Sequence, residues 1–264
     1  MTQPMNKRQA IQGTVALGLA VAVGATRLAR HHPLAAAALI AGTVAYGSAA
    51  YRPTSRLMGT PLAHGSRAGA KIAITFDDGP GPSTMAVLDQ LAAAGVPATF
   101  FVLGREVERY PDAVRRIVAD GHQLASHGWD HGILIFRGPR HVAAQLRRTE
   151  EAVARVAGDG ALTRMFRAPH GFRGPATALG VRAAGYRMAA WSHGVFDSAE
   201  PGAAVIARRC ERVLAPGVVL LLHDADGWSP GTARPQTVAA LPEVLRAVRA
   251  RNLEPVRLDR LVDR

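Results

Sequence analysis

The sequence predicts an α/β protein, built as a distorted (β/α) barrel of about seven parallel strands and preceded by one or two apolar helices. After residue 70, short apolar runs alternate with longer amphipathic segments, which is the pattern of βαβ units in a parallel sheet. About six or seven such units indicate a barrel slightly short of eight strands. Two uncharged apolar stretches precede this alternation and set the N-terminus apart.

Each expected element follows from its local pattern. Apolar runs of buried-strand type predict the strands, and amphipathic segments bounded by Gly or Pro predict the helices. We expect strands at 71–76, 97–104, 122–127, 164–171 (a strand and then a turn), 186–192 and 217–224, and a weak strand at 254–258. We expect helices at 83–95, 110–121, 139–158, 175–185, 202–217 and 234–252.

The N-terminal stretches 10–26 and 33–50 are each close to the minimum length that crosses a bilayer as a helix. Basic residues flank both stretches and no acid precedes Asp77, which favours membrane contact over a buried soluble helix pair. We therefore expect residues 1–50 to be a membrane anchor or signal region, 51–69 a linker, and 70–264 the catalytic domain.

The sequence leaves the form of this region open between a two-helix hairpin, a single anchor and a cleaved signal. A single anchor or a cleaved signal would export the domain, whereas a hairpin would imply a cytoplasmic domain and a lipid-linked substrate. We expect a membrane-associated protein and favour the extracytoplasmic side for its catalytic domain.

The charge of the chain is unevenly distributed. The net charge is +12, and residues 1–68 hold seven basic residues and no acid. This basic excess lies beside the apolar stretches and suits a membrane surface. The sequence has no basic stripe with interleaved aromatic residues, so we expect no nucleic-acid partner, and nothing in it indicates a protein partner. The single cysteine, Cys210, excludes a disulfide within the chain.

Ionisable residues gather where five of the expected strands end. In α/β barrels the loops that follow the strands collect at one end, and the active site lies there. Charged and imidazole groups at so many strand ends are difficult to explain by packing. The residues are Asp77 and Asp78, His127 and His131, Arg167, Asp197, and His223 with Asp224.

Two histidines and a carboxylate among these residues predict a metal site. His127 and His131 are four residues apart and could lie on one face of a helical turn. With one aspartate they make a site of three ligands and an open position, as a hydrolytic metal requires. Asp77 and Asp78 point in different directions at a strand end, so one can bind the metal while the other faces its water. The residue pattern alone does not show which of the two aspartates binds the metal and which faces the water.

Five motifs occur in order: "TFDDGP", "HGWDH", "FRAPHG", "WSHGVFD" and "LLLHD". Over residues 70–260 the chain thereby resembles the polysaccharide deacetylase family, the NodB-homology domain of carbohydrate esterase family four. The resemblance implies that Asp77 is the general base. It further implies that Asp78, His127 and His131 bind one divalent metal ion, for which zinc is the default with this ligand set.

The resemblance also implies roles for the remaining site residues. Arg167 is expected to orient the base, and His223 to be the general acid, supported by Asp197. The backbone N–H of His170 would help to hold the oxyanion, and Leu221 would line the pocket for the acyl methyl group. These roles suit an amide, which needs a polarised carbonyl, an activated water and a protonated leaving group.

The chain departs from the family pattern around the expected substrate groove. His170 replaces the usual tyrosine, Gly194 replaces an aspartate, and Ser198 replaces a tryptophan. Trp228 follows the acid histidine and could either be a platform for a sugar ring or simply pack. The chemistry therefore matches the family pattern, while the saccharide stays open.

These observations predict a metal-dependent hydrolase that removes N-acetyl groups from amino sugars in a polymeric, oligomeric or lipid-linked saccharide. Two alternatives stay open. The same fold could remove a formyl group or open a cyclic imide, or the chain could be a membrane-tethered carbohydrate-binding pseudoenzyme. A complete set of base, acid and metal ligands argues against the last, because binding alone needs neither base nor acid.

Overall fold

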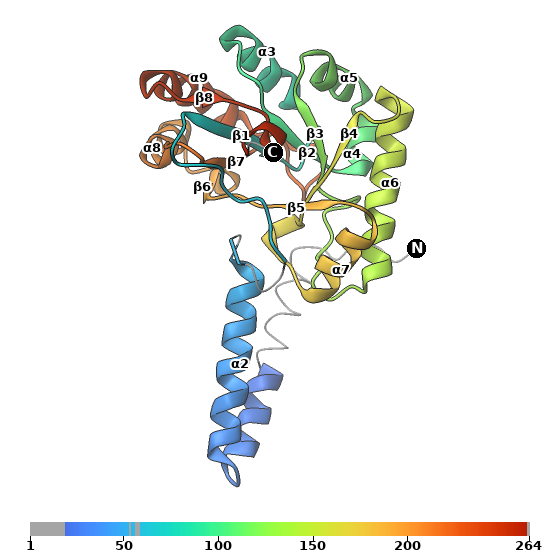
Figure 1. The fold of residues 1–264 in the computed structure, drawn as a ribbon, viewed down its shortest axis with the longest axis vertical. Coiled ribbons are helices and arrows are strands. Elements are labelled where there is room, and N and C mark those ends of the chain that lie inside the picture. The colour runs from blue at the N-terminus through green and yellow to red at the C-terminus, as the bar shows by residue number, and fades with distance from the viewer. Residues whose placement is uncertain (1–18, 53, 56–58, 263–264) are drawn as a thin grey trace.

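Strands and helices alternate from residue 71 to the C-terminus in the computed structural model, which describes residues 19–52, 54–55 and 59–262 (Figure 1). The strands are β1 (Lys71–Asp77), β2 (Thr99–Val102), β3 (Gln123–Ser126), β4 (Leu162–Arg167), β5 (Arg187–Ala189), β6 (His193–Gly194), β7 (Val219–His223) and β8 (Glu254–Pro255). The helices of this part are α3 (Thr84–Ala94), α4 (Gly104–Arg109), α5 (Pro111–Ala119), α6 (Pro139–Ala157), α7 (Pro175–Ala183), α8 (Ala203–Val213) and α9 (Pro235–Ala250).

The strands form one curled sheet of the half-barrel type with the order β5-β4-β3-β2-β1-β7-β6, and β8 pairs with the start of β1. All neighbouring pairs are parallel, so the carboxyl ends of the strands point the same way. In the described part of the chain β5 and β6 do not pair with each other. The predicted α/β class and parallel barrel-like sheet are therefore confirmed.

The apolar residues that predicted these elements build the core. Every residue of β1 after Lys71 is buried, as are all of β2 and β3. The long helix α6 buries Val142, Leu146 and Val153, whose spacing places them on one helical face against the sheet. The helices thus pack around the sheet and fix it in place. The loops at the carboxyl ends of the strands are then available for a functional site.

Two local expectations for this part of the chain were wrong. Residues 127–131 do not form a helical turn, because Gly128 and His131 have φ angles of 88° and 60°. Their left-handed backbone makes an irregular loop instead. The helix α4, directly after β2, was not predicted, because its six residues are too few to show a helical period.

The N-terminal region forms a helical hairpin. A helix over Leu19–Ala29 turns back at Arg30 and His31 into α2 (Pro33–Tyr51), and the two helices extend away from the barrel (Figure 1). Residues 33–50 of α2 are long and apolar enough to cross a membrane, and only 17% of that window is buried. Residues 10–18 of the first predicted stretch lie outside the described residues.

Part of the predicted linker pairs with the barrel. The Leu62 N–H donates to the Met188 carbonyl, and the Ala190 N–H donates to the Leu62 carbonyl. A second contact joins the Gly65 N–H to the Gly217 carbonyl. Residues 62–65 therefore lie along the open side of the sheet, and the chain between hairpin and barrel is held at more than one point.

Candidate active site

The parallel register brings the predicted residues together at the carboxyl end of the sheet. Asp77, the last residue of β1, is the direct neighbour of His223 at the end of β7. A cavity of about 510 Å³ opens over these strand ends, a volume within the range of small-molecule sites. All the predicted site residues line it except Arg167, which lies behind Asp77.

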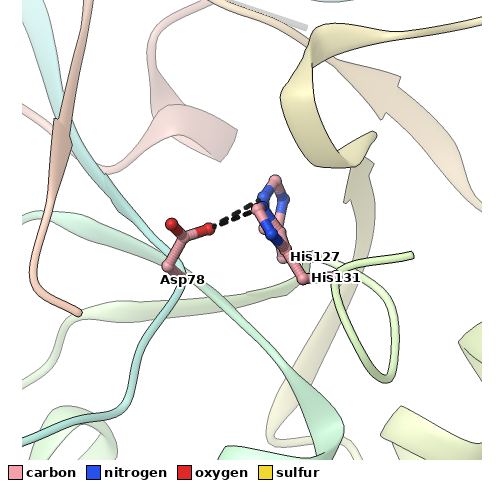
Figure 2. A group of neighbouring side chains, drawn as sticks. All are labelled: Asp78, His127 and His131. Carbon is pink, nitrogen blue, oxygen red and sulfur yellow. Dashed lines mark ion pairs between the residues drawn. The ribbon is translucent and has the colours of Figure 1, made fainter. Parts of the chain in front are cut away.

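Asp78, His127 and His131 face one another in this cavity, with ligand atoms that all lie within 4.8 Å (Figure 2). Oδ1 of Asp78 is 3.0 Å from Nε2 of His131 and 3.4 Å from Nε2 of His127. All three side chains are buried. The carboxylate comes from the end of β1 and the imidazoles from the loop after β3, so two neighbouring loops build the group.

Each ligand is oriented by a further contact. Nδ1 of His127 lies 2.9 Å from the carbonyl oxygen of Arg167, and since a carbonyl only accepts, Nδ1 carries the proton and Nε2 presents a lone pair. Oδ2 of Asp78 accepts a hydrogen bond from the Gly227 N–H at 3.0 Å. A Cβ atom at Gly227 would overlap the His131 ring, so a glycine is required where this loop covers the site.

The donor set fits a divalent metal ion. Oδ1 of Asp78 is buried and has no donor in the described part of the chain besides the two imidazole nitrogens that face it. At 3.4 Å, Oδ1 and the His127 Nε2 lone pair are both acceptors, so a cation between them would satisfy both. Burial alone would raise the pKa of Asp78, but His131 and His127 outweigh it and hold the pKa well below its usual value.

Asp77 is held apart from this group by an ion pair. Its Oδ1 accepts a hydrogen bond from the Arg167 guanidinium at 2.6 Å, and its Oδ2 points toward His127 at 3.8 Å. Arg167 is fully buried and is fixed by further bonds to the Thr75 hydroxyl and the Ala190 carbonyl. The two adjacent aspartates thus have different partners, and Asp77 keeps one oxygen directed at the cavity.

His223 ends β7 and is paired with Asp197. Nδ1 of His223 is 2.9 Å from Oδ1 of Asp197, whose Oδ2 accepts from the His223 backbone N–H and the Thr237 hydroxyl. Burial alone would lower the pKa of His223, but the Asp197 carboxylate outweighs it and raises the pKa to about 9. His223 is therefore protonated at neutral pH and can donate a proton from Nε2.

The residues that are expected to contact the substrate differ in their neighbours and in their burial. Leu221 lines the cavity beside Gly194. Trp228 stacks on the His170 ring with centroids 4.4 Å apart, and both line the cavity, so its role as a sugar platform stays a prediction. Burial and the neighbouring His131 lower the pKa of His170 to about 3, so the ring is neutral. Its Nε2–H donates to the His131 carbonyl at 3.2 Å.

Several cavity residues were missed by sequence reasoning. Trp191 lines the cavity, whereas Trp129 lies in the core, and no motif in the sequence distinguishes the two. Arg234 is buried and joins two loops of the rim through Asp226 and the Ser198 carbonyl. No sequence motif marks Arg234, because an arginine in a helical stretch is usually solvated.

The comparisons with known proteins agree with this site. The family model described as polysaccharide deacetylase matches residues 64–189. A chitooligosaccharide deacetylase from Bradyrhizobium sp. (strain ANU 289) is 38% identical over 190 residues, which cover 69% of this chain and 85% of that protein. A peptidoglycan N-acetylglucosamine deacetylase, PgdA from Listeria monocytogenes, is 32% identical over 80% of this chain and 42% of its own length.

The fold has solved counterparts as well. The crystal structure of a peptidoglycan N-acetylglucosamine deacetylase, Bc1960, superposes with a TM-score of 0.70 at 28% identity, covering 76% of this chain and 91% of that one. The family match at residues 64–189 includes the ends of β1, β3 and β4, where the Asp-His-His group and Arg167 lie. The chain belongs to the polysaccharide deacetylase family, carbohydrate esterase family 4.

Proposed function

We propose that this protein is a metal-dependent, membrane-anchored carbohydrate N-deacetylase that hydrolyses the acetamido group of an N-acetylated amino sugar. One observation carries the proposal: a buried Asp-His-His group shares one cavity with a carboxylate held by arginine and a histidine held by aspartate. Hydrolysis of an amide needs a base for the water and an acid for the amine, on opposite sides of the carbon attacked.

The metal would be held by Asp78, His127 and His131, and zinc is the ion that this ligand set favours. When bound, a divalent ion polarises the amide carbonyl and acidifies the attacking water. The low pKa of Asp78 supports this role, because a ligand must be deprotonated.

Asp77 is the proposed general base. Its Oδ2 faces the cavity while Arg167 binds Oδ1, so the carboxylate cannot rotate away from an attacking water. The backbone around His170 would bind the developing oxyanion, and Leu221 would contact the methyl group of the acetyl.

His223 is the proposed general acid. The proton on its ring is transferred to the nitrogen of the departing amine, and Asp197 stabilises the imidazolium until that moment. Asp197 keeps its own negative charge, because His223 outweighs the effect of burial and lowers the pKa of that carboxyl.

A binding-only function is the main competitor. The family fold includes a pseudoenzyme from Bacillus anthracis, which superposes at 20% identity with a TM-score of 0.67 and so speaks for the fold alone. In this chain the base, the acid and all three ligand residues are present and arranged for reaction, which favours catalysis.

We further propose that residues 1–50 anchor the protein in a membrane through the hairpin, and that residues 70–264 are the catalytic domain. The exposed apolar surface of α2, including Leu34, Ile40 and Val44, supports this arrangement. Fractionation should place the full chain with membranes. Release into a soluble fraction without detergent would contradict the anchor. A hairpin that spans the membrane twice would place the catalytic domain in the cytoplasm, whereas the predicted extracytoplasmic side requires a single span or a cleaved signal. Protease protection of a C-terminal tag distinguishes the two sides.

The test of the enzymatic proposal is release of acetate from N-acetylated saccharides by the full-length protein loaded with zinc. Chitooligosaccharides are the first substrates to offer, because relatives of similar length carry that name. Formate or an opened imide ring as the product from matched substrates would instead indicate one of the alternative activities. Binding of saccharide without any product would indicate a pseudoenzyme.

A further inference from the structure

The helix α2 meets the catalytic domain at its C-terminal end. Ala49 and Ala50 are buried, whereas Leu34, Leu39 and Val44 are exposed along the rest of the helix. Figure 1 shows α2 leaving the barrel at this end and extending away from it. The orientation of the hairpin is therefore set by a short stretch at the last turn of α2.

A buried arginine fixes that stretch. The Arg173 guanidinium donates to the carbonyl of Arg52 at 2.7 Å and to that of Ser55 at 3.4 Å. The backbone N–H of Arg173 donates to the Ala50 carbonyl at 3.2 Å. Carbonyls at a helix C-terminus lack helical partners and carry partial negative charge, so a cation stabilises them. Arg173 is 1% exposed, which makes this a rigid joint and not a tether.

The joint lies beside the active site. A Cβ atom placed on Gly174 would be 3.2 Å from the Tyr46 hydroxyl of α2 and 3.3 Å from Cγ1 of Ile135. Gly174 is four residues from His170, and Ile135 is four residues from His131. Four residues of chain span at most about 14 Å. The loop that meets α2 at Gly174, and the loop of Ile135 packed beside it, therefore both lead into the cavity within that distance.

The length of α2 places the joint at a membrane surface. Its 19 residues rise about 28 Å, close to the roughly 30 Å hydrocarbon core of a bilayer. The polar turn at Arg30 and His31 stands at the far end. Tyr46 and Arg52 stand at the near end, as is usual for tyrosine and arginine at the interface. The cavity therefore opens near the level of the lipid headgroups.

We propose that the substrate is an N-acetylated amino sugar joined through phosphate to a hydrocarbon tail embedded in the same membrane. This inference rests on the proposed deacetylase function and narrows its substrate class. A sugar next to the phosphate of such a lipid lies at headgroup depth, where the cavity opens. Arg52 is exposed at the joint, so its guanidinium can reach a phosphate at headgroup depth.

The experiment uses full-length protein, loaded with zinc, in phosphatidylethanolamine–phosphatidylglycerol vesicles. The probes are N-acetylglucosaminyl phosphate with a long polyprenyl tail and the same sugar phosphate with a methyl group instead. Confinement to one surface raises the effective concentration, so we expect the tailed probe to be deacetylated about a hundredfold faster at equal amounts.

Two variants separate the geometry of the joint from simple membrane confinement. Arg173→Gln removes the guanidinium hydrogen bonds to the carbonyls of Arg52 and Ser55, directly after α2. It should reduce the preference for the tailed probe at least about threefold while retaining the rate on the methyl probe. Tyr46→Ala, on an exposed helix face, should act in the same direction and does not endanger the core. Arg182→Gln, which removes an exposed arginine of the neighbouring α7, is the matched control and should change nothing.

The outcomes distinguish a failure of this inference from a failure of the proposed deacetylase function. Loss of preference in both joint variants, with an unaffected Arg182→Gln, supports the inference. Equal rates on the two probes in the wild-type protein, or a preference that survives both joint substitutions, overturn it while leaving the deacetylase function intact. Absence of acetate from either probe and from chitooligosaccharides overturns the proposed function itself.

Discussion

The residues at the bottom of the cavity and those at its rim are held in different ways. Asp77, Asp78 and His127 are almost fully buried, and each contacts a partner from another element. At the rim, Phe196 is 68% exposed, and β6 beside it has only two residues. The side chains at the bottom of the cavity are thus fixed by packing and hydrogen bonds, whereas those at the rim are held less tightly.

This difference explains why the sequence matches the family pattern at some positions and departs from it at others. A ligand or base must be held within a fraction of an ångström, which strand ends and buried partners provide. Rim residues sit on loops, where changes cost little stability. Gly194 and Ser198 both lie in the rim. The proposed roles therefore assign the reaction to the residues at the bottom, and the choice of saccharide to those at the rim and in the hairpin.

The largest effect should come from removing a ligand at the bottom. His131→Ala should abolish both metal binding and acetate release, because two remaining ligands cannot hold the ion in place. Elemental analysis and an acetate assay on the same preparation measure both properties. Retention of metal together with full activity would show that the ion binds elsewhere.

A smaller effect should come from the loop that covers His131. Gly227→Ala should weaken metal binding about 10- to 100-fold, since the added methyl overlaps the His131 ring and displaces the N–H that binds Asp78. Titration against a zinc chelator measures the affinity. Ser229→Ala, in the same loop and exposed, is the control. Equal affinities for the two variants would mean that the loop does not position the ligands.

The role of His223 as the general acid should be visible in the pH dependence of activity. His223 acts in its protonated form, so activity should persist up to its pKa of about 9 and fall above it. Asp197→Asn removes the charge that raises this pKa, so the alkaline limb should move to lower pH. The acidic limb should move less. Asp226→Asn, also in the cavity, is the control. An unmoved alkaline limb in Asp197→Asn would mean that another group supplies the proton.

The smallest effect should come from the rim. Phe196→Ala should raise KM for a chitooligosaccharide by about two- to tenfold, the worth of one aromatic contact, with little change in kcat. Phe136→Ala removes an equally exposed phenylalanine outside the cavity and should leave both constants unchanged. A large loss of kcat in Phe196→Ala would contradict the division between bottom and rim.

The sequence predicted the bottom of the cavity better than its surroundings, for physical reasons. Polar residues after apolar strands stand out, because the strand pattern leaves no packing role for them. Gly227 and Arg234 could not be recognised, since their roles depend on contacts with residues far away in the chain. The expected helical turn at His127–His131 failed because spacing alone does not reveal the positive φ angle of His131.

In the region before the barrel, too, the sequence did not reveal contacts between residues far apart in the chain. Composition predicted apolar helices and a linker, and α2 agrees with the second apolar stretch. Arg173 gave no signal of its role, because nothing in "GFRGP" marks a partner more than a hundred residues earlier. Pairing of Leu62 with β5 was equally invisible, since two hydrogen bonds leave no sequence pattern. Contacts between distant segments therefore need the structure.

The division of labour between the adjacent aspartates is the central claim, and metal content measured beside turnover tests it most directly. Asp77→Asn and the wild type should each bind about one zinc per chain. The variant should also lose turnover by about a hundredfold or more, because a base is removed and a ligand is not. Asp78→Asn should lose the metal as well as the activity. Loss of zinc from Asp77→Asn, or a zinc-loaded Asp78→Asn with normal turnover, would contradict the account.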